Sequence, residues 1–220
     1  MMKKYDLVIF DLDGTLADTS PGILNSIRYV QKKMGLTAIT TEQMYSHVGP
    51  PMEESYRRNF GLEGEELRRA VELHKEYAVK QGYREIEVYP GIPQLLGRLH
   101  REGVKTAVAT LKAQTTADKI FAEFGLRTAF DLVLGTDASA PKTKAQLLEE
   151  CIAKLQCTKA RTVLIGDSKY DAEGALQAGI DFIAVTYGFG FKSAADAAVY
   201  SPTVVCDTVR EMENFLHDSD

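Results

Sequence analysis

The first residues in this chain that could carry out chemistry are two aspartates. They lie two residues apart, directly after a short apolar run. They belong to the segment Asp11-Leu12-Asp13-Gly14-Thr15. Carboxylates this close repel each other unless a cation or a shared proton neutralises them, and their oxygens suit Mg²⁺. Asp11 could also be a nucleophile, and Gly14 would let the chain turn and bring backbone N–H groups toward an anion. The alternative is a solvated turn, since Asp, Gly and Thr are all turn residues.

A second polar segment, Thr110-Leu111-Lys112, follows the apolar run 104–109. The Thr110 hydroxyl could donate to a phosphate oxygen, and the backbone N–H of Leu111 could assist it. A polar residue at this place also caps a helix, here one running from Ala113 onward. The segment therefore fits either a phosphate contact or a helix start.

A third segment, Pro141-Lys142-Thr143-Lys144, opens a helical pattern. An ammonium group beside a phosphate can hold the charge that develops in the transition state. Taken alone, a solvated lysine at a helix start is the simpler interpretation. The segment offers two candidate lysines for one phosphate.

The fourth segment runs from Gly166 to Asp171, after the apolar run 163–165. Asp167 could join a metal site, and Asp171, one helical turn later, could ligate through water or orient the other ligands. An N-cap role would explain Asp167 but not the second carboxylate. Ligands of open parallel sheets bind at the carboxyl ends of the strands, so the four segments together predict one phosphoryl-transfer site.

The elements that must position these residues are short apolar runs, most of them separated by helical patterns. The runs cover residues 7–10, 104–109, 132–134, 163–165, 182–185 and 204–205. This alternation predicts an α/β fold with a parallel sheet and crossover helices. From about residue 20 to 81 only helical spacing appears, which predicts a helical insert. We expect residues 1–18 and 83–220 to form the α/β core and residues 19–82 the insert.

Composition narrows the classes of partner. The formal net charge of −5 over 220 residues offers no broad basic field, so nucleic acid is not an expected partner. The sequence contains no long uncharged stretch, so it predicts no membrane span. Asp11 and Asp13 end the first apolar run before it reaches the length of a secretory signal. Cys151, Cys157 and Cys206 lack the paired spacing of zinc sites. We expect a cytoplasmic protein with reduced thiols.

The combination of segments resembles the haloacid dehalogenase superfamily, specifically its phosphatase branch, over essentially the whole chain. The matching positions are Asp11 to Leu16 for the motif DxDGTL, Thr110 for the second motif, Lys142 or Lys144 for the third, and Gly166 to Asp171 for GDxxxD. The helical insert resembles the small α-helical cap of these enzymes. The segments 47–55 and 186–190 look like the "GPPL..SF" and "YGYG" stretches of phosphoglycolate phosphatase-like members.

The resemblance implies a Rossmann-like core and a Mg²⁺-dependent phosphatase that works through an aspartyl-phosphate intermediate. It implies that Asp11 attacks phosphorus and that Asp13 protonates the leaving oxygen and then deprotonates water. Mg²⁺ would be held by the Asp11 carboxylate, the Asp13 backbone carbonyl and Asp167, with support from Asp171.

The resemblance also implies which residues bind substrate. Gly14, Thr110, the Leu111 backbone N–H and one lysine would bind the phosphoryl group, and His47 is a candidate in the cap. Counting back from the apolar pair at 147–148 favours Lys144, whereas a K-P-x-P-x-x-L register favours Lys142. Of the two, we expect Lys144 to bind the phosphate.

Several functions share these motifs. The expected substrate is a small phosphomonoester, with phosphoglycolate or a nucleoside monophosphate as candidates, and 5'-nucleotidase-like or β-phosphoglucomutase-like activity are alternatives. Asp13 argues against dehalogenase and phosphonatase chemistry, because those branches lack the second carboxylate. A regulatory protein that only binds a phosphate ligand would be expected to lose Asp11, Asp13 or Asp167. The protein is expected to be a monomer or a homodimer.

Overall fold

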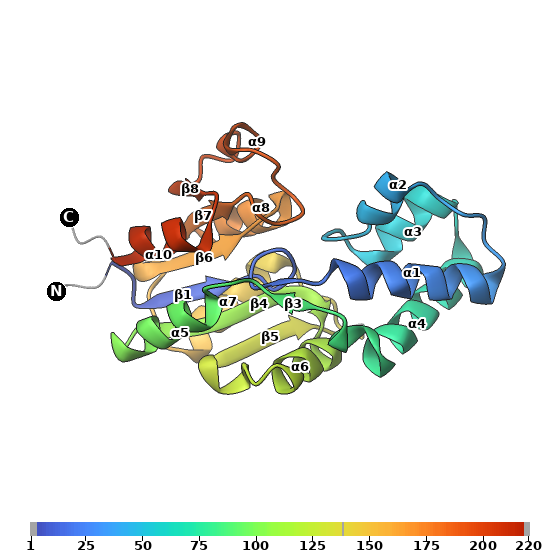
Figure 1. Ribbon diagram of the computed structural model, residues 1–220. Helices are drawn as coiled ribbons and strands as arrows, with labels where there is room; N and C mark the ends of the chain where they lie inside the picture. The colour runs from blue at the N-terminus through green and yellow to red at the C-terminus, as the bar shows by residue number, and fades with distance from the viewer. Residues whose placement is uncertain (1–3, 138, 218–220) are drawn as a thin grey trace. The chain divides into compact units, whose positions relative to one another are not determined.

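The structure is a computed structural model that describes residues 4–137 and 139–217. The chain divides into two compact units, an α/β unit and a helical unit (Figure 1). One contains the residues up to Ala17 together with those from Val88 onward, and the other spans Asp18–Glu87. The chain thus leaves the first unit once and returns to it once.

The α/β unit is built on a six-stranded sheet in the order β5-β4-β1-β6-β7-β8 (Figure 1). Every neighbouring pair in it is parallel. The strands are β1 Leu7–Phe10, β4 Lys105–Ala113, β5 Leu132–Thr136, β6 Thr162–Gly166, β7 Asp181–Val185 and β8 Val204–Cys206. The chain order reverses on either side of β1, and ligands of such sheets bind at that switch point, outside the carboxyl ends of the strands. The predicted α/β class and parallel sheet are confirmed.

Helices connect these strands and cover the sheet. They are α5 Ile92–Arg101, α6 Gln114–Glu123, α7 Lys144–Lys154, α8 Lys169–Ala178, α9 Ala194–Ala198 and α10 Val209–His217, with the 3-10 turns η2 Arg127–Ala129 and η3 Lys159–Arg161. α7 and α8 share one apolar cluster with β1 and β6, in which Leu147, Leu148 and Ala175 are fully buried. Full burial of a leucine side chain is worth about 1.5–3 kcal/mol, so this packing holds the starts of α7 and α8 against the sheet.

The helical unit consists of α1 Ser20–Met34, α2 Thr41–Tyr45, α3 Met52–Phe60, α4 Gly64–Lys80 and the 3-10 turn η1 Gly82–Arg84. Its core gathers Val30, Tyr56, Leu67, Ala70 and Leu73 from three of the helices. The spacing of these residues by three or four positions within α4 produces the apolar stripe that the sequence predicts.

The boundary between the units lies at the short strands β2 Ala17–Asp18 and β3 Glu87–Val88, which pair as a two-stranded sheet. The helical unit thus ends at Glu87 rather than at residue 82. The reason is Glu85, whose backbone carbonyl accepts from Gly22 N at 3.0 Å and whose carboxylate accepts from Tyr77 Oη and Gln81 Nε2 at 2.9 Å. These bonds keep η1 with the helices.

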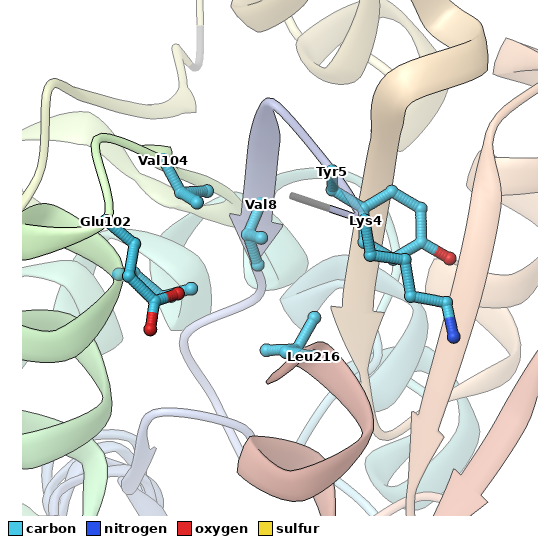
Figure 2. A pocket seen from close by; sticks show the side chains of 7 residues that line it. Lys4, Tyr5, Val8, Glu102, Val104 and Leu216 are labelled. Carbon is cyan, nitrogen blue, oxygen red and sulfur yellow. The ribbon is translucent and has the colours of Figure 1, made fainter. Parts of the chain in front are cut away.

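A small pocket lies at the opposite, amino end of the sheet, beside the residues that precede β1 and β4 (Figure 2). It is lined by Lys4, Tyr5, Val8, Leu99, Glu102, Val104 and Leu216 and has an open volume of about 20 Å³. That is space for about one water molecule, so this pocket cannot hold a substrate. Over the described residues, no helix has both the length and the apolar character that a membrane span requires.

Candidate active site

Three strand ends bring the predicted site residues of the α/β unit together. Asp11 directly follows β1, Thr110 lies in β4, and Asp167 directly follows β6. Parallel pairing sets Phe10 opposite Val108 and Ile165, so the residues after these positions meet at one edge of the sheet. Asp11, Thr110 and Asp167 are all buried.

Asp11, Asp167 and Asp171 form a compact carboxylate cluster. One oxygen atom from each lies within 4.8 Å of the corresponding atoms of the other two. Asp171 comes from the first turn of α8, where Ser168 N and Oγ donate to its Oδ2 at 3.2 and 2.6 Å. Ser168 is also the N-cap residue of α8, so Asp167 does not take the capping role that was its alternative interpretation.

Lys144 lies inside this cluster and Lys142 lies outside it. Lys144 Nζ donates to Asp11 Oδ1 at 2.7 Å and to the Ala109 carbonyl at 2.8 Å, and it is 2.8 Å from Asp171 Oδ1. The Lys142 side chain is 43% exposed and pairs with Glu150 on the surface. Of the two candidate lysines, the structure therefore brings only Lys144 to the carboxylates.

Local structure explains why Lys144 reaches the site. Thr143 caps α7 through a reciprocal pair of hydrogen bonds with Gln146, at 2.9 and 3.2 Å, which makes Lys144 the first residue of the helix. Its stem then packs on Gly174 of α8, where any Cβ would overlap Lys144 Cγ. A side chain at position 174 would therefore displace the lysine.

Asp167 is enclosed by glycines. Its Oδ2 accepts from Phe189 N at 2.6 Å and from Gly190 N at 3.0 Å. A Cβ at Gly14, which has φ +79°, or at Gly188 would overlap that oxygen. The segment 186–190, which the sequence singled out only through a family resemblance, thus holds a carboxylate of the cluster. The feature of the sequence that could have predicted this contact is the pair of glycines on either side of Phe189.

Asp13 has a basic partner that the sequence interpretation missed. Lys112 Nζ lies 3.0 Å from Asp13 Oδ1. The expected strand ends at residue 109, but β4 continues to Ala113 through a shift of register after Ala109. Thr110 Oγ1 accepts from Lys112 N at 3.1 Å, and the N-cap of α6 is Ala113, so Thr110 is not a helix cap. The signal for Lys112 was its place in the Thr110-Leu111-Lys112 segment.

Burial and mutual repulsion perturb the carboxyl groups. Burial raises the pKa of Asp167 to about 7, and the charge of Asp171 adds to the rise. Burial also holds the pKa of Asp11 well above its ordinary value, with Lys144 opposing and Asp171 and Asp13 reinforcing the effect. Burial alone would lower the pKa of Lys144, but Asp11 and Asp171 outweigh it and raise that pKa. The cluster therefore binds protons unless another positive charge is present.

The donor set fits a divalent cation that binds oxygen. Within the described residues, the site holds four carboxylates, those of Asp11, Asp13, Asp167 and Asp171, and two ammonium groups. Lys112 pairs with Asp13, and Lys144 with Asp11 and Asp171. Fully ionised, this group carries two excess negative charges, which one divalent ion would balance. Oxygen-only ligands suit Mg²⁺, Ca²⁺ or Mn²⁺ rather than the metals that prefer thiolate or imidazole.

His47 lies in the interior of the helical unit. Its ring centroid is 5.2 Å from that of Tyr56 and 5.9 Å from that of Phe60, and the residue is 5% exposed. Burial, reinforced by the charge of Arg58, lowers its pKa to about 4. His47 therefore packs as a neutral core residue here, and its role in substrate binding stays a prediction.

The sequence pattern of haloacid dehalogenase-like hydrolases matches residues 8–185. The chain belongs to this family. Membership in the haloacid dehalogenase-like hydrolases confirms the predicted superfamily, its Rossmann-like fold and the prediction of an enzyme.

Similar proteins span nearly the whole of this haloacid dehalogenase-like chain. A tyrosine-protein kinase, PtkA of Mycobacterium tuberculosis, is 34% identical over 209 residues, which are 93% of this chain and 71% of that protein. A phosphoglycolate phosphatase of Nitrosospira multiformis is 32% identical over 191 residues, 83% of each chain. The solved structure of the haloacid dehalogenase-like family protein SP0104 from Streptococcus pneumoniae has a TM-score of 0.89 at 29% identity and covers 98% of this chain and 100% of its own.

Proposed function

We propose that the protein is a Mg²⁺-dependent phosphatase that hydrolyses small phosphomonoesters through an aspartyl-phosphate on Asp11. One observation carries this proposal: Lys144 Nζ joins Asp11 and Asp171 at the carboxyl end of β1, beside Asp167. The phosphatase relative and the family supply the reaction class. An aspartate that has both a fixed ammonium group and a set of metal-ligating neighbours is equipped to attack a phosphorus atom.

In the first step, an Asp11 carboxylate oxygen attacks phosphorus, the Asp11–phosphate bond forms and the ester P–O bond breaks. Asp13 gives its proton to the leaving oxygen, and the product leaves as an alcohol that carries this proton on its hydroxyl group. In the second step, Asp13 removes a proton from water as the water oxygen attacks phosphorus. Inorganic phosphate leaves and the Asp11 carboxylate is restored.

Neighbouring groups bind the phosphoryl oxygens during both steps. Thr110 Oγ1 accepts from Lys112 N, so its own O–H remains available to donate to a phosphoryl oxygen. The backbone N–H of Leu111 lies beside the same strand ends, where an uncharged donor stabilises developing negative charge. The N–H of Gly14 donates to the Ala17 carbonyl at 2.9 Å, so Gly14 contributes through the turn it allows rather than as a donor. Lys144 favours the ionised form of Asp11, because its charge opposes the rise in the pKa of Asp11 that burial and the neighbouring carboxylates cause.

Mg²⁺, when bound, would neutralise charge on the phosphoryl oxygens and screen the approach of Asp11 to a dianion. Asp11, Asp167 and Asp171 are the carboxylates that would hold it, with the Asp13 backbone carbonyl. The oxygen-only donor set and the two excess negative charges support this assignment.

Phosphoglycolate and nucleoside monophosphates are the substrates to test first, since a relative is named a phosphoglycolate phosphatase. A second candidate is transfer of the phosphoryl group from Asp11 to an acceptor hydroxyl instead of water, because another relative is named a tyrosine-protein kinase. Hydrolysis releases one inorganic phosphate for each ester consumed. Transfer releases less phosphate than ester lost, so measuring both separates the two activities.

The proposal is tested by p-nitrophenyl phosphate turnover with Mg²⁺. We expect Asp11→Asn to lower kcat by about 10³-fold or more, because the nucleophile is lost. The matched control Asp118→Asn removes a carboxylate that is exposed on α6 and is expected to keep full activity. EDTA is expected to abolish turnover, and Mg²⁺ to restore it. An inactive wild type, or an Asp11→Asn variant as active as the control, would refute the phosphatase.

A further inference from the structure

One ammonium group beside the active site has no part in the phosphoryl-transfer scheme above. Lys112 Nζ lies 3.0 Å from Asp13 Oδ1, and the two side chains are 16% and 14% exposed. The pair is therefore largely removed from solvent but still open to it. An exposed ion pair contributes little to stability. This pair includes Asp13, the residue that transfers protons in the scheme above.

The backbone fixes where Lys112 stands. Its N–H donates to Thr110 Oγ1 at 3.1 Å, and on the other side a Cβ at Gly135 of β5 would come within 2.7 Å of the Lys112 carbonyl and 2.8 Å of Gln114 Cα. Gly135 N also donates to Gln114 Oε1 at 2.6 Å. The shifted end of β4 is thus held against β5, and this contact places Lys112 beside Asp13.

The two lysines of the site differ in how many N–H donors of their ammonium groups remain free to bind a ligand. An ammonium carries three N–H donors. Lys144 donates to Asp11 and to the Ala109 carbonyl and forms an ion pair with Asp171, whose Oδ1 lies 2.8 Å from its Nζ, so three acceptors surround its ammonium group. Lys112 has one carboxylate partner within the described part of the chain, Asp13, so two donors remain for a ligand.

We propose that Lys112 binds an anionic group on the leaving part of the substrate. The preferred substrates are then phosphomonoesters whose alcohol carries a carboxylate or a second phosphate close to the ester oxygen. This inference rests on the proposed function, in which Asp13 contacts the ester oxygen in order to protonate it. Nζ stands one hydrogen bond from Asp13, which puts it within roughly 3–6 Å of that oxygen. A carboxylate carbon two bonds beyond the ester oxygen, or a second phosphorus four bonds beyond it, brings its oxygens into that range.

Three substrates with the same two-carbon skeleton test the inference. Phosphoglycolate carries a carboxylate, the bisphosphate of ethane-1,2-diol carries a second phosphate, and ethyl phosphate carries neither. We expect Lys112→Met to lower kcat/KM for an anionic substrate about 10- to 100-fold more than for ethyl phosphate, since a charged hydrogen bond is lost only with the anion. Comparing each variant with wild type on the same ester cancels differences between the leaving groups. A preferential loss with phosphoglycolate assigns a carboxylate, and one with the bisphosphate assigns a phosphate.

Two further variants and a control complete the experiment. Lys112→Arg keeps the charge and should retain most of the preference, whereas Lys112→Gln keeps a donor to Asp13 without the charge and should lose it. Lys105→Met changes a lysine at the far end of the same strand, whose Nζ bonds to the Leu155 carbonyl, and should leave all three rates unchanged. The Lys112→Gln result decides the question if Lys112→Met does not fold.

Equal losses on all three esters would overturn the inference, because Lys112 would then act only by positioning Asp13. That result would leave the proposed phosphatase standing. A wild type that hydrolyses none of the three esters and no p-nitrophenyl phosphate would overturn the proposed function and this inference with it.

Discussion

Lys144→Met is the substitution whose effect follows most directly from the structure. It removes the ammonium group but keeps most of the length of the stem that packs on Gly174. The lysine is 5% exposed, and Asp11 and Asp171 lie 2.7 and 2.8 Å from its Nζ. Their carboxylates would face each other in the variant with no positive charge between them. Removing one partner of a buried ion pair costs about 3–5 kcal/mol, and we expect the free energy of unfolding of the α/β unit to fall by that amount.

The matched control for this prediction is Lys154→Met, in the last turn of the same helix. Lys154 Nζ lies 2.9 Å from Glu150 Oε1, and its side chain is 54% exposed, so its loss is expected to cost about 0–1 kcal/mol. Urea denaturation in EDTA, followed by far-ultraviolet circular dichroism, measures both variants. Added Mg²⁺ should recover part of the stability of Lys144→Met, since a ligand of the native state stabilises it by mass action.

The pH dependence of the Lys144→Met cost has a defined sign. Asp11 already has a raised pKa in the wild type, and removal of Lys144 takes away the charge that opposes the rise. A group whose pKa is higher in the folded state binds more protons there, so its contribution to stability declines as pH rises. The cost should therefore be larger at pH 7 than at pH 5. A denaturation midpoint that falls no further than that of Lys154→Met would refute the reasoning.

Two other outcomes are expected. Gly188→Ala should lower phosphatase activity about 10-fold or more, because its Cβ would overlap both the Gly14 carbonyl and Asp167 Oδ2 and displace a carboxylate that we propose to hold the metal. A Mg²⁺ titration of activity measures the loss, and Gly97→Ala, where a Cβ meets nothing closer than 3.5 Å, is the control. The helical unit should lose up to about 3 kcal/mol as pH falls from about 6.5 toward 4, because the pKa of His47 is lowered to about 4 in the folded state and protonation favours the unfolded chain; thermal denaturation should show a weaker pH dependence for His47→Leu, and an unchanged one would contradict this account.

The strand ends could be predicted from the sequence because their signal is local. Asp11 and Asp167 each follow a run of apolar residues, and alternation with helical patterns indicates parallel strands, whose carboxyl ends share one edge. The contacts that distinguish Lys144 from Lys142 are only partly local in the sequence. They depend on the cap that Thr143 forms with Gln146 and on the bare face of Gly174, which comes from the next helix in the chain.

The sequence pointed to the segments that contain Lys112 and residues 186–190, but their contacts with Asp13 and Asp167 could not be predicted, for a related reason. The apolar run at 104–109 gives no sign that β4 continues to Ala113, since the extension depends on contacts with Gly135 of the neighbouring strand. The bonds from Phe189 and Gly190 to Asp167 join positions that are 22 and 23 residues apart. Tertiary contacts of this kind produce no pattern of apolar and polar residues in either segment from which they could be predicted.

The enclosure of Asp167 restricts how a cation can be coordinated. Its Oδ2 is occupied by two backbone N–H groups, and Asp11 Oδ1 and Asp171 Oδ2 are occupied by Lys144 and Ser168. Asp11 and Asp167 are thereby inclined to offer a cation a single oxygen each rather than to chelate it with both. Both oxygens of Asp171 are engaged, because its Oδ1 also lies 2.8 Å from Lys144 Nζ. Ca²⁺ commonly takes six to eight oxygens and accepts bidentate carboxylates, whereas Mg²⁺ demands a compact octahedron and keeps several waters. The glycines around Phe189, which carry no ligand side chain, would thus influence which ion the proposed metal site selects.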